Sequence, residues 1–307
     1  MIDYICFIVL LIAVYVIAGT SLNILIGFAG IFSLAHAAFM GIGAYATTIL
    51  MINLNINYFL TIPVSFIIGG ITSAILGMMI LRVKGDQYII GSLAFQALIF
   101  GFFMNAVDIT NGPYGFFNIP KPSLFKFTFT SLTSIMILAI ILTIICVIIC
   151  QRLSKSAFGQ VLTAIREDDI ATESLGKNVS FFKIAAFSIC GGLVAIGGSL
   201  YAIAVGFIDP FAFELHQSVF MLAIVIIGGT GNIWGSVVGA IFLFMLPEVL
   251  KLFHMSEAVA GPVRSMLYGL LLLLFMAFKP NGMLPERTGK ISIKIKNEVP
   301  KGANSES

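Results

Sequence analysis

The stretch SLTSIMILAIILTIICVIIC, from Ser131 to Cys150, contains no charged residue, no Pro and no Gly. The hydrocarbon core of a bilayer is about 30 Å thick, and a helix of about 20 apolar residues crosses it. Because no water is present inside that core, the backbone of such a segment must satisfy its own hydrogen bonds, which favours an α-helix. The stretch therefore predicts a transmembrane helix.

The composition of the whole chain agrees with this prediction. Of the 307 residues, 59% are hydrophobic and 10% are charged, whereas a soluble globular chain is about 45–50% apolar and about 25% charged. This excludes a water-soluble enzyme and a disordered chain, and a formal net charge of +3 is too small to indicate a nucleic-acid partner. The cysteines lie in apolar runs without a CxxC pair, so we expect buried small hydrophobes and no disulfide scaffold, redox site or metal site: Cys6, Cys146, Cys150 and Cys190.

Apolar runs near membrane length recur on both sides of the first one. They predict an all-α polytopic membrane protein with about nine transmembrane helices. The expected spans are Tyr4–Ile26, Leu34–Ile52, Tyr58–Leu81, Gln87–Met104, Ser131–Cys150, Ile184–Val205, Leu215–Gly229, Ile233–Leu250 and Val263–Phe278.

Two Gly-rich junctions interrupt this pattern. Residues 26–30 and 227–231 share the sequence Ile-Gly-x-x-Gly, either through an internal duplication or by chance. Each junction is either a tight turn or a broken, re-entrant helix, because non-helical backbone at membrane depth is tolerated only where protein or a water-filled cavity surrounds it.

The positive charges give the orientation. With the C-terminus in the cytoplasm, all but four of the 17 Lys and Arg residues fall on the inner side, as the positive-inside rule requires. The N-terminus then lies outside. It has no basic region and no small-residue cleavage site, so we expect no removable signal peptide. We expect a membrane domain over 1–286 and a basic cytoplasmic tail over 287–307. The four outer basic residues are Lys121, Lys126, Lys251 and Arg264.

The longest polar stretch separates two spans and runs from Gln151 to Lys183. Within it an apolar stripe at helical spacing over residues 161–165 predicts a short amphipathic helix at the cytoplasmic face, with Gly176 as a helix stop. The helix could lie on lipid headgroups or dock on a protein. The consecutive acids Glu167, Asp168 and Asp169 would be repelled by anionic lipid, which favours a protein groove.

Ionisable residues are few within the predicted spans. Glu248, Arg264, Asp86 and Asp209 lie near predicted span ends, so no acidic or basic side chain stands at the centre of a run. Ion-coupled carriers and proton pumps normally keep such a residue there. The sequence also lacks a P-loop and a catalytic constellation, so the chain is not expected to be an enzyme, and ATP, if it drives the protein, must bind another subunit.

Several motifs lie along the chain. They are SLNILIGFAG (21–30) with SLAHAAF (33–39), RVKGDQY (82–88), TNGP (110–113), the charged segment from Gly159 to Asn178, and GGTGNIWGSVVGA (228–240). In these motifs, and over the length from Gly19 to Pro285, the chain resembles the membrane-spanning permease subunits of bacterial branched-chain amino-acid ABC importers, specifically the longer of the two paired permeases. One departure is Ser236, which stands where the family commonly has Pro.

The resemblance implies a set of partners and a place in the cell. Two cytoplasmic ATPase subunits would hold ATP and Mg, a second permease subunit would pair with this chain, and an extracytoplasmic binding protein would deliver substrate. The chain itself would hold no cofactor and would lie in the bacterial inner membrane. The segment 151–183 would be the coupling loop that docks on an ATPase, through Gly159, Ala164, Ile165, Arg166, Glu167, Asp168, Asp169, Ala171 and Gly176.

The substrates implied are leucine, isoleucine and valine. A zwitterion in a dry pore needs hydrogen-bond partners, so Asn23, His36, Gln96 and Asn105 are the candidates for contacting it or for gating water. A lone His such as His36 does not predict a metal site. Three alternatives stay open: an importer of urea, short amides or another small solute in the same family, an ion-coupled secondary carrier or channel, and an intramembrane enzyme.

Overall fold

The computed structural model describes residues 2–80, 87–124, 127–129 and 131–251, with 266, 269–271, 273–275, 277–279 and 282–284 near the C-terminus. The predicted tail over 287–307 lies outside this part of the chain. So does much of the ninth predicted span, Val263–Phe278, although every described residue within that span is helical.

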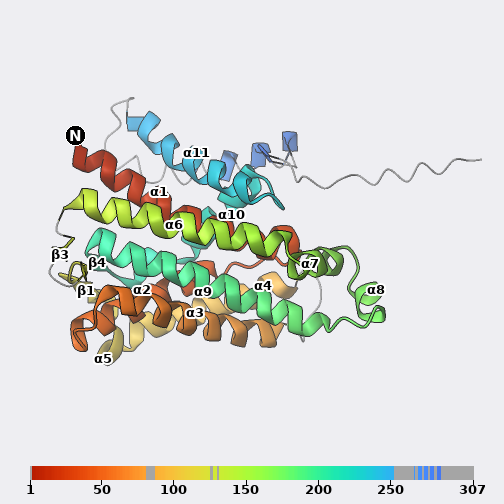
Figure 1. The fold of residues 1–307 in the computed structure, drawn as a ribbon, viewed down its shortest axis with the longest axis horizontal. Coiled ribbons are helices and arrows are strands. Elements are labelled where there is room, and N and C mark those ends of the chain that lie inside the picture. Colours follow the sequence, from red (N-terminus) through yellow and green to blue (C-terminus); the bar gives the residue numbers. More distant parts are fainter. Residues whose placement is uncertain are drawn as a thin grey trace, which may run out of the picture.

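The described chain is a bundle of long helices that run side by side along one axis (Figure 1). The long helices are α1 (Ile2–Asn23), α2 (His36–Asn53), α3 (Tyr58–Ile80), α4 (Gln87–Asn105), α6 (Leu132–Lys155), α9 (Val179–Val205), α10 (Leu215–Gly228) and α11 (Ile233–Lys251). A π-helical turn, η1 (Ile24–Phe28), continues α1. The short helices are α5 (Val107–Thr110), η2 (Gly112–Tyr114), α7 (Ala157–Glu167), α8 (Asp169–Ser174) and η3 (Pro210–Phe213).

The predicted all-α membrane fold is confirmed in its main features. Among the described residues, six helices are long and apolar enough to cross a membrane, and a shorter apolar helix covers Ile233–Leu246. Helix α2 forms where a span was predicted but is not among the six. The count of nine crossings stays a prediction. The six helices cover Asp3–Phe28, Tyr58–Met79, Gln87–Asn105, Leu132–Lys155, Val179–Val205 and Pro210–Gly228.

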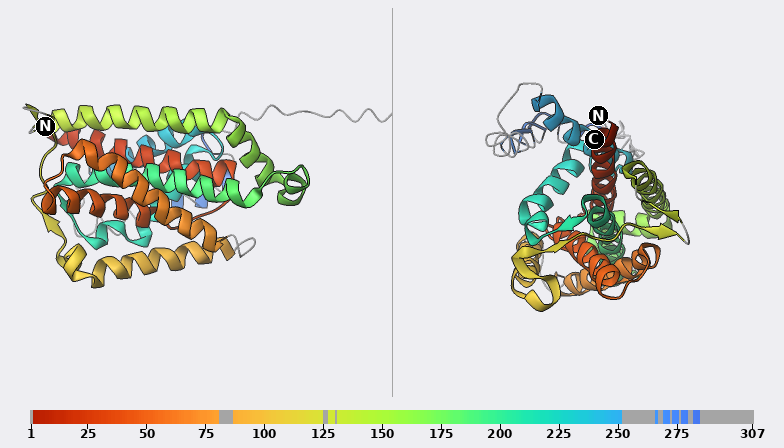
Figure 2. Two further views of the ribbon diagram at one scale, coloured as in Figure 1. Left: turned by 60° about the horizontal axis from the view of Figure 1, so that its bottom comes forward. Right: turned by 90° about the vertical axis from the view of Figure 1, so that its left-hand side faces the viewer.

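The two ends of the bundle differ (Figure 2). One end carries the N-terminus and two short antiparallel pairs, β1 (Phe116–Phe117) with β4 (Phe207–Ile208), and β2 (Ser123–Leu124) with β3 (Phe127–Thr128). The other end carries α7 and α8 (Figure 1). The N-terminus and the segment 151–183 thus lie at opposite ends, as the charge distribution predicted.

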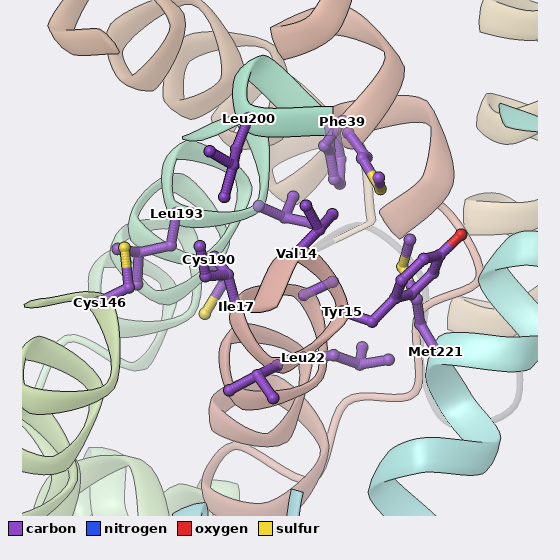
Figure 3. Packing of buried hydrophobic residues seen from close by; sticks show 14 of the residues in the cluster. Val14, Tyr15, Ile17, Leu22, Phe39, Cys146, Cys190, Leu193, Leu200 and Met221 are labelled. Atoms are coloured by element: carbon purple, nitrogen blue, oxygen red, sulfur yellow. The ribbon is translucent and has the colours of Figure 1, made fainter. Parts of the chain in front are cut away.

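Helix α9 occupies the centre of the bundle and packs against α1, α2 and α3. Figure 3 shows side chains of α1, α2, α6, α9 and α10 meeting in one buried cluster. All four cysteines are free and buried, as the sequence predicted. Because lipid offers no hydrophobic drive for helices to associate, such contacts depend on close van der Waals fit.

Glycine sets the approach of α2 to α9. A Cβ added at Gly198 would fall on the carbonyl oxygen of Met40, far inside van der Waals contact. At the neighbouring Gly197, an added Cβ would meet the nearest side-chain atom, of Ile17, at 3.5 Å, which is an ordinary contact. A side chain is therefore excluded at Gly198 but fits at Gly197.

We expect Gly198→Ala to separate α2 from α9 and to lower the unfolding temperature of the detergent-solubilised protein by several degrees, because the clash is with rigid backbone. Gly197→Ala serves as the matched control and should leave that temperature nearly unchanged. Equal unfolding temperatures for the two variants would contradict the packing described here.

Candidate functional site

Helix α2 begins inside the bundle rather than at its end. After η1 the chain runs back without helical structure over residues 29–35, with Ile31 and Ser33 buried. The backbone N–H of Leu34 donates to Oγ of Ser92 at 2.9 Å, and α2 starts two residues later. The first Gly-rich junction is therefore a re-entrant break, not a tight turn.

Helix α10 begins at the same level from the opposite direction. The chain enters through η3 and Glu214, and Oγ of Ser218 in the first turn accepts a hydrogen bond from the N–H of Ala37 at 2.9 Å. Oη of Tyr15, near the middle of α1, donates to Oε1 of Gln217 at 2.9 Å. The N-termini of α2 and α10 thus meet near the middle of the bundle.

Gln96 of α4 joins the starts of α2 and α10. Its Oε1 accepts from the N–H of Ala38 at 2.8 Å and lies 3.4 Å from Oγ of Ser218, and its Nε2 donates to the carbonyl oxygen of Phe213 at 2.7 Å. The first N–H groups of a helix have no partner within it, and Gln96 supplies one. With 2% of its surface exposed, Gln96 holds both helix starts in this conformation.

His36 lies two residues before Ala38, whose N–H donates to Gln96. Asn105 lies at the far end of α4, away from both. His36 is fully buried at the start of α2, and within the described residues neither of its ring nitrogens has a hydrogen-bond partner. Its ring lies edge-on to Phe39, with centroids 6.0 Å apart. Asn105 is exposed at the far end of α4 and donates to the carbonyl oxygen of Gly101 at 2.7 Å.

Asn23 lies at the other end of the bundle, where it fastens the turn between α10 and α11 to the end of α1. Its Nδ2 donates to the carbonyl oxygens of Gly229 (3.2 Å) and Asn232 (2.9 Å) and to Oγ of Ser236 (2.7 Å). Its Oδ1 accepts from the N–H of Gly231 at 2.9 Å. The hydroxyl of Ser236 serves here as an acceptor, which Pro at this position could not provide.

The two Gly-rich junctions contact each other. A Cβ added at Gly27 would lie 2.7 Å from Cα of Gly231, so only glycine permits the approach. The second junction is a tight turn between α10 and α11, whereas the first is the break before α2. The two Ile-Gly-x-x-Gly segments therefore share a contact but not a conformation.

The polar stretch 151–183 holds two short helices where one was predicted. Ser156 caps α7 by accepting from the N–H of Gly159 at 3.4 Å. Asp168 is extended and caps α8 by accepting from Ile170 (2.9 Å) and Ala171 (3.0 Å), and this cap divides the segment. The predicted stop at Gly176 is confirmed by its φ of +78°.

The apolar stripe of α7 faces the bundle and the acidic end of the segment faces out. Leu162 and Ile165 are buried within the protein itself. The side chain of Glu167 is 71% exposed, and Ile170 is 77% exposed. Of the residues predicted to couple, Gly159 and Ile165 are buried. The outer face carries exposed acids together with exposed apolar side chains, and Ala164 and Ala171 are exposed as well.

Polar and packing contacts of Arg166 and Lys183 tie this helix pair to the bundle. Nη1 of Arg166 donates to the carbonyl oxygen of Gly27, at the end of α1. Gly30 has a φ of +68°, and a Cβ added there would lie 2.8 Å from Cγ of Arg166. Nζ of Lys183 lies 2.5 Å from Oδ2 of Asp169, which links α8 to α9. Arg166 thus touches the break from which α2 emerges.

Sequence reasoning missed Glu214 and His216. The predicted span Leu215–Gly229 begins directly after Glu214 and includes His216, yet neither was considered as a site residue. The structure places both beside Gln96, level with the middle of α4. Nδ1 of His216 lies 3.4 Å from Oε2 of Glu214. A cavity of about 270 Å³ is lined by these residues with Gln96 and four apolar neighbours: Leu93, Ala97, Phe100 and Leu215. The available signal was an acid and a His at the start of the shortest predicted span.

The sequence profile of a protein family described as "Branched-chain amino acid transport system / permease component" matches residues 4–276. The chain is 29% identical to the high-affinity branched-chain amino acid transport system permease protein LivM of Escherichia coli, over 94% of this chain and 71% of that protein. It is 26% identical to the probable branched-chain amino acid transport permease protein LivM of Methanocaldococcus jannaschii, over 93% and 94% of the two chains.

A ribose import permease, RbsC of Haemophilus influenzae, is 26% identical over 70% of this chain and 67% of its own length. No solved structure gives a significant match. The similarity to the LivM proteins thus extends over almost the whole chain, while the similarity to a permease with a different named substrate covers less of it.

Proposed function

The chain belongs to the permease family of branched-chain amino-acid ABC importers, and on that basis we propose that it carries leucine, isoleucine and valine into the cytoplasm. It is a multi-pass transport subunit of the bacterial inner membrane and not an enzyme. The observation that carries the substrate proposal is the near full-length similarity to two LivM permeases.

The energy would come from partner subunits. The permease family functions within ABC complexes, and the sequence has no P-loop of its own. Two cytoplasmic ATPase subunits would bind ATP and Mg. A second permease chain would pair with this one, and an extracytoplasmic binding protein would deliver the substrate.

The helix pair α7–α8 is the surface proposed to dock on an ATPase. It projects from the end of the bundle opposite the N-terminus (Figure 1), and its outer face carries acids and exposed apolar side chains such as Ile170 and Leu175. Such a mixed face suits a protein groove better than an anionic headgroup layer.

Movement of that surface would reach the centre of the bundle through a short chain of contacts. Arg166 holds the carbonyl oxygen of Gly27 and packs on Gly30, and the non-helical residues 31–35 lead directly into α2. A shift of α7 on ATP binding would therefore displace the start of α2, where His36 and Gln96 lie. Alternating access needs such a two-position element.

The predicted pathway residues fall at three levels under this proposal. His36 and Gln96 lie at the centre, Asn23 at the α7 end and Asn105 at the opposite end. We assign the central pair to the passage of substrate. We assign the gating of water to the two terminal asparagines: Asn23, which is buried, would hold one end closed, and Asn105 is exposed at the other end.

Uptake of labelled leucine tests the substrate. In cells lacking the gene, leucine uptake should fall at least tenfold and return when the gene is restored. Unlabelled valine should suppress the restored uptake and unlabelled urea should not, because the proposed pathway accepts aliphatic zwitterions. Restored uptake that urea suppresses and valine does not would contradict the branched-chain assignment and favour the amide alternative.

Charge reversal tests the docking surface. We expect Glu167→Lys with Asp168→Lys to abolish co-purification of the ATPase while the protein still inserts in the membrane, since two acids of the proposed contact change sign. Because Asp168 also caps α8, Glu167→Lys alone should be measured too and should weaken co-purification. Asp108→Lys, at the opposite end of the bundle, is the control. Normal co-purification with the double variant would exclude this surface.

A further inference from the structure

The cavity between α4 and the start of α10 combines one carboxylate, Glu214, with an apolar wall, and Gln96 and His216 complete its lining. Leu93, Ala97 and Phe100 of α4 and Leu215 of α10 supply the apolar wall. The side chain of Glu214 is 40% exposed and that of His216 is 62% exposed, so both reach the cavity's open side. At about 270 Å³, the space suits a solute of amino-acid size, below the usual range for larger ligands.

The position of this carboxylate is the unusual feature. Gln96 lies near the middle of α4, and its hydrogen bond to Phe213 fixes the residue just before Glu214 at the same level. An ionisable side chain at mid-membrane that faced lipid would be costly, and such residues almost always face a water-filled cavity or another protein. This face of α4 and α10 therefore belongs on the inside of the assembled importer.

We propose that this cavity binds an aliphatic α-amino acid, with the carboxylate of Glu214 receiving the ammonium group and the apolar wall receiving the side chain. The inference rests on the proposed function and names the place where its substrate is recognised. His216, 3.4 Å from Glu214 through Nδ1, positions the carboxylate when no substrate is bound.

The lining explains a preference for aliphatic over polar side chains. A polar side chain placed against Leu93, Phe100 and Leu215 would lose its hydrogen bonds to water without gaining others, whereas an aliphatic one gains by leaving water. The ammonium group needs a hydrogen-bond acceptor of opposite charge, and Glu214 is the carboxylate in the lining of this cavity.

The test uses the whole importer, with both permeases, the ATPases and the binding protein, reconstituted in vesicles and driven by ATP. Glu214→Gln should reduce leucine uptake at least tenfold while the ATPases still co-purify, because the neutral amide keeps the shape and removes the charge. Glu214→Asp should recover part of the uptake. Asp108→Asn, which removes an exposed carboxylate outside the cavity, should transport as the wild type does.

A second pair of variants tests the apolar wall. Ala97 lines the cavity and Ala94, one helical turn away on α4 and equally exposed, does not. Ala97→Leu should shrink the space and shift the uptake ratio of leucine to alanine at least fivefold toward alanine. Ala94→Leu should leave that ratio unchanged.

The outcomes separate this inference from the proposed function. If the wild-type complex imports leucine and Glu214→Gln imports it equally well, the ammonium site is wrong and the importer assignment stands. An unchanged uptake ratio in Ala97→Leu would likewise reject the cavity. If the wild-type complex imports no leucine but does import an uncharged solute, both the proposed substrate and this site are wrong.

Discussion

The hydrogen bonds of Gln96 are the contacts on which the centre of this protein depends. Inside a bilayer, backbone N–H and C=O groups must find partners within the protein, and each one left unpaired costs about 1–3 kcal/mol. Two helices start in mid-bundle here, and one amide side chain accepts from Ala38 and donates to the carbonyl oxygen of Phe213. Without such a side chain the re-entrant segments would have no stable place at this depth.

Because the breaks are held this way, distant parts of the chain share one junction. The end of α1, the turn between α10 and α11, and helix α7 all meet at residues 23–30, through Asn23, Gly27 and Arg166. Residues 31–35 then connect that junction to the start of α2. The path from the exposed helix pair to the centre is therefore short, and it is made of close packing and of side-chain hydrogen bonds to backbone groups.

Much of the fold was predictable from the sequence, and most of what the sequence analysis missed depends on contacts between distant segments. Apolar runs such as Ser131–Cys150 identified helices because hydropathy reports burial in lipid, and the motif at 159–178 identified the family that the comparisons confirm. Hydropathy carries no information on depth, however. The contacts that hold the start of α2 and the mid-bundle position of Glu214 and His216 are tertiary hydrogen bonds that no local pattern encodes. The division of the coupling segment at Asp168 is instead a local N-cap, which the sequence reasoning did not use.

Under the proposed function, substrate passes where α2 and α10 begin, and this place opens to one side of the membrane at a time. Leu215 lines the cavity and is partly exposed, so a single cysteine at Leu215, with the four buried native cysteines replaced by alanine, reports its access in the assembled importer. A membrane-impermeant thiol reagent should label it from one side without nucleotide and from the opposite side with ATP trapped. Labelling from the same side in both states would contradict alternating access at this place.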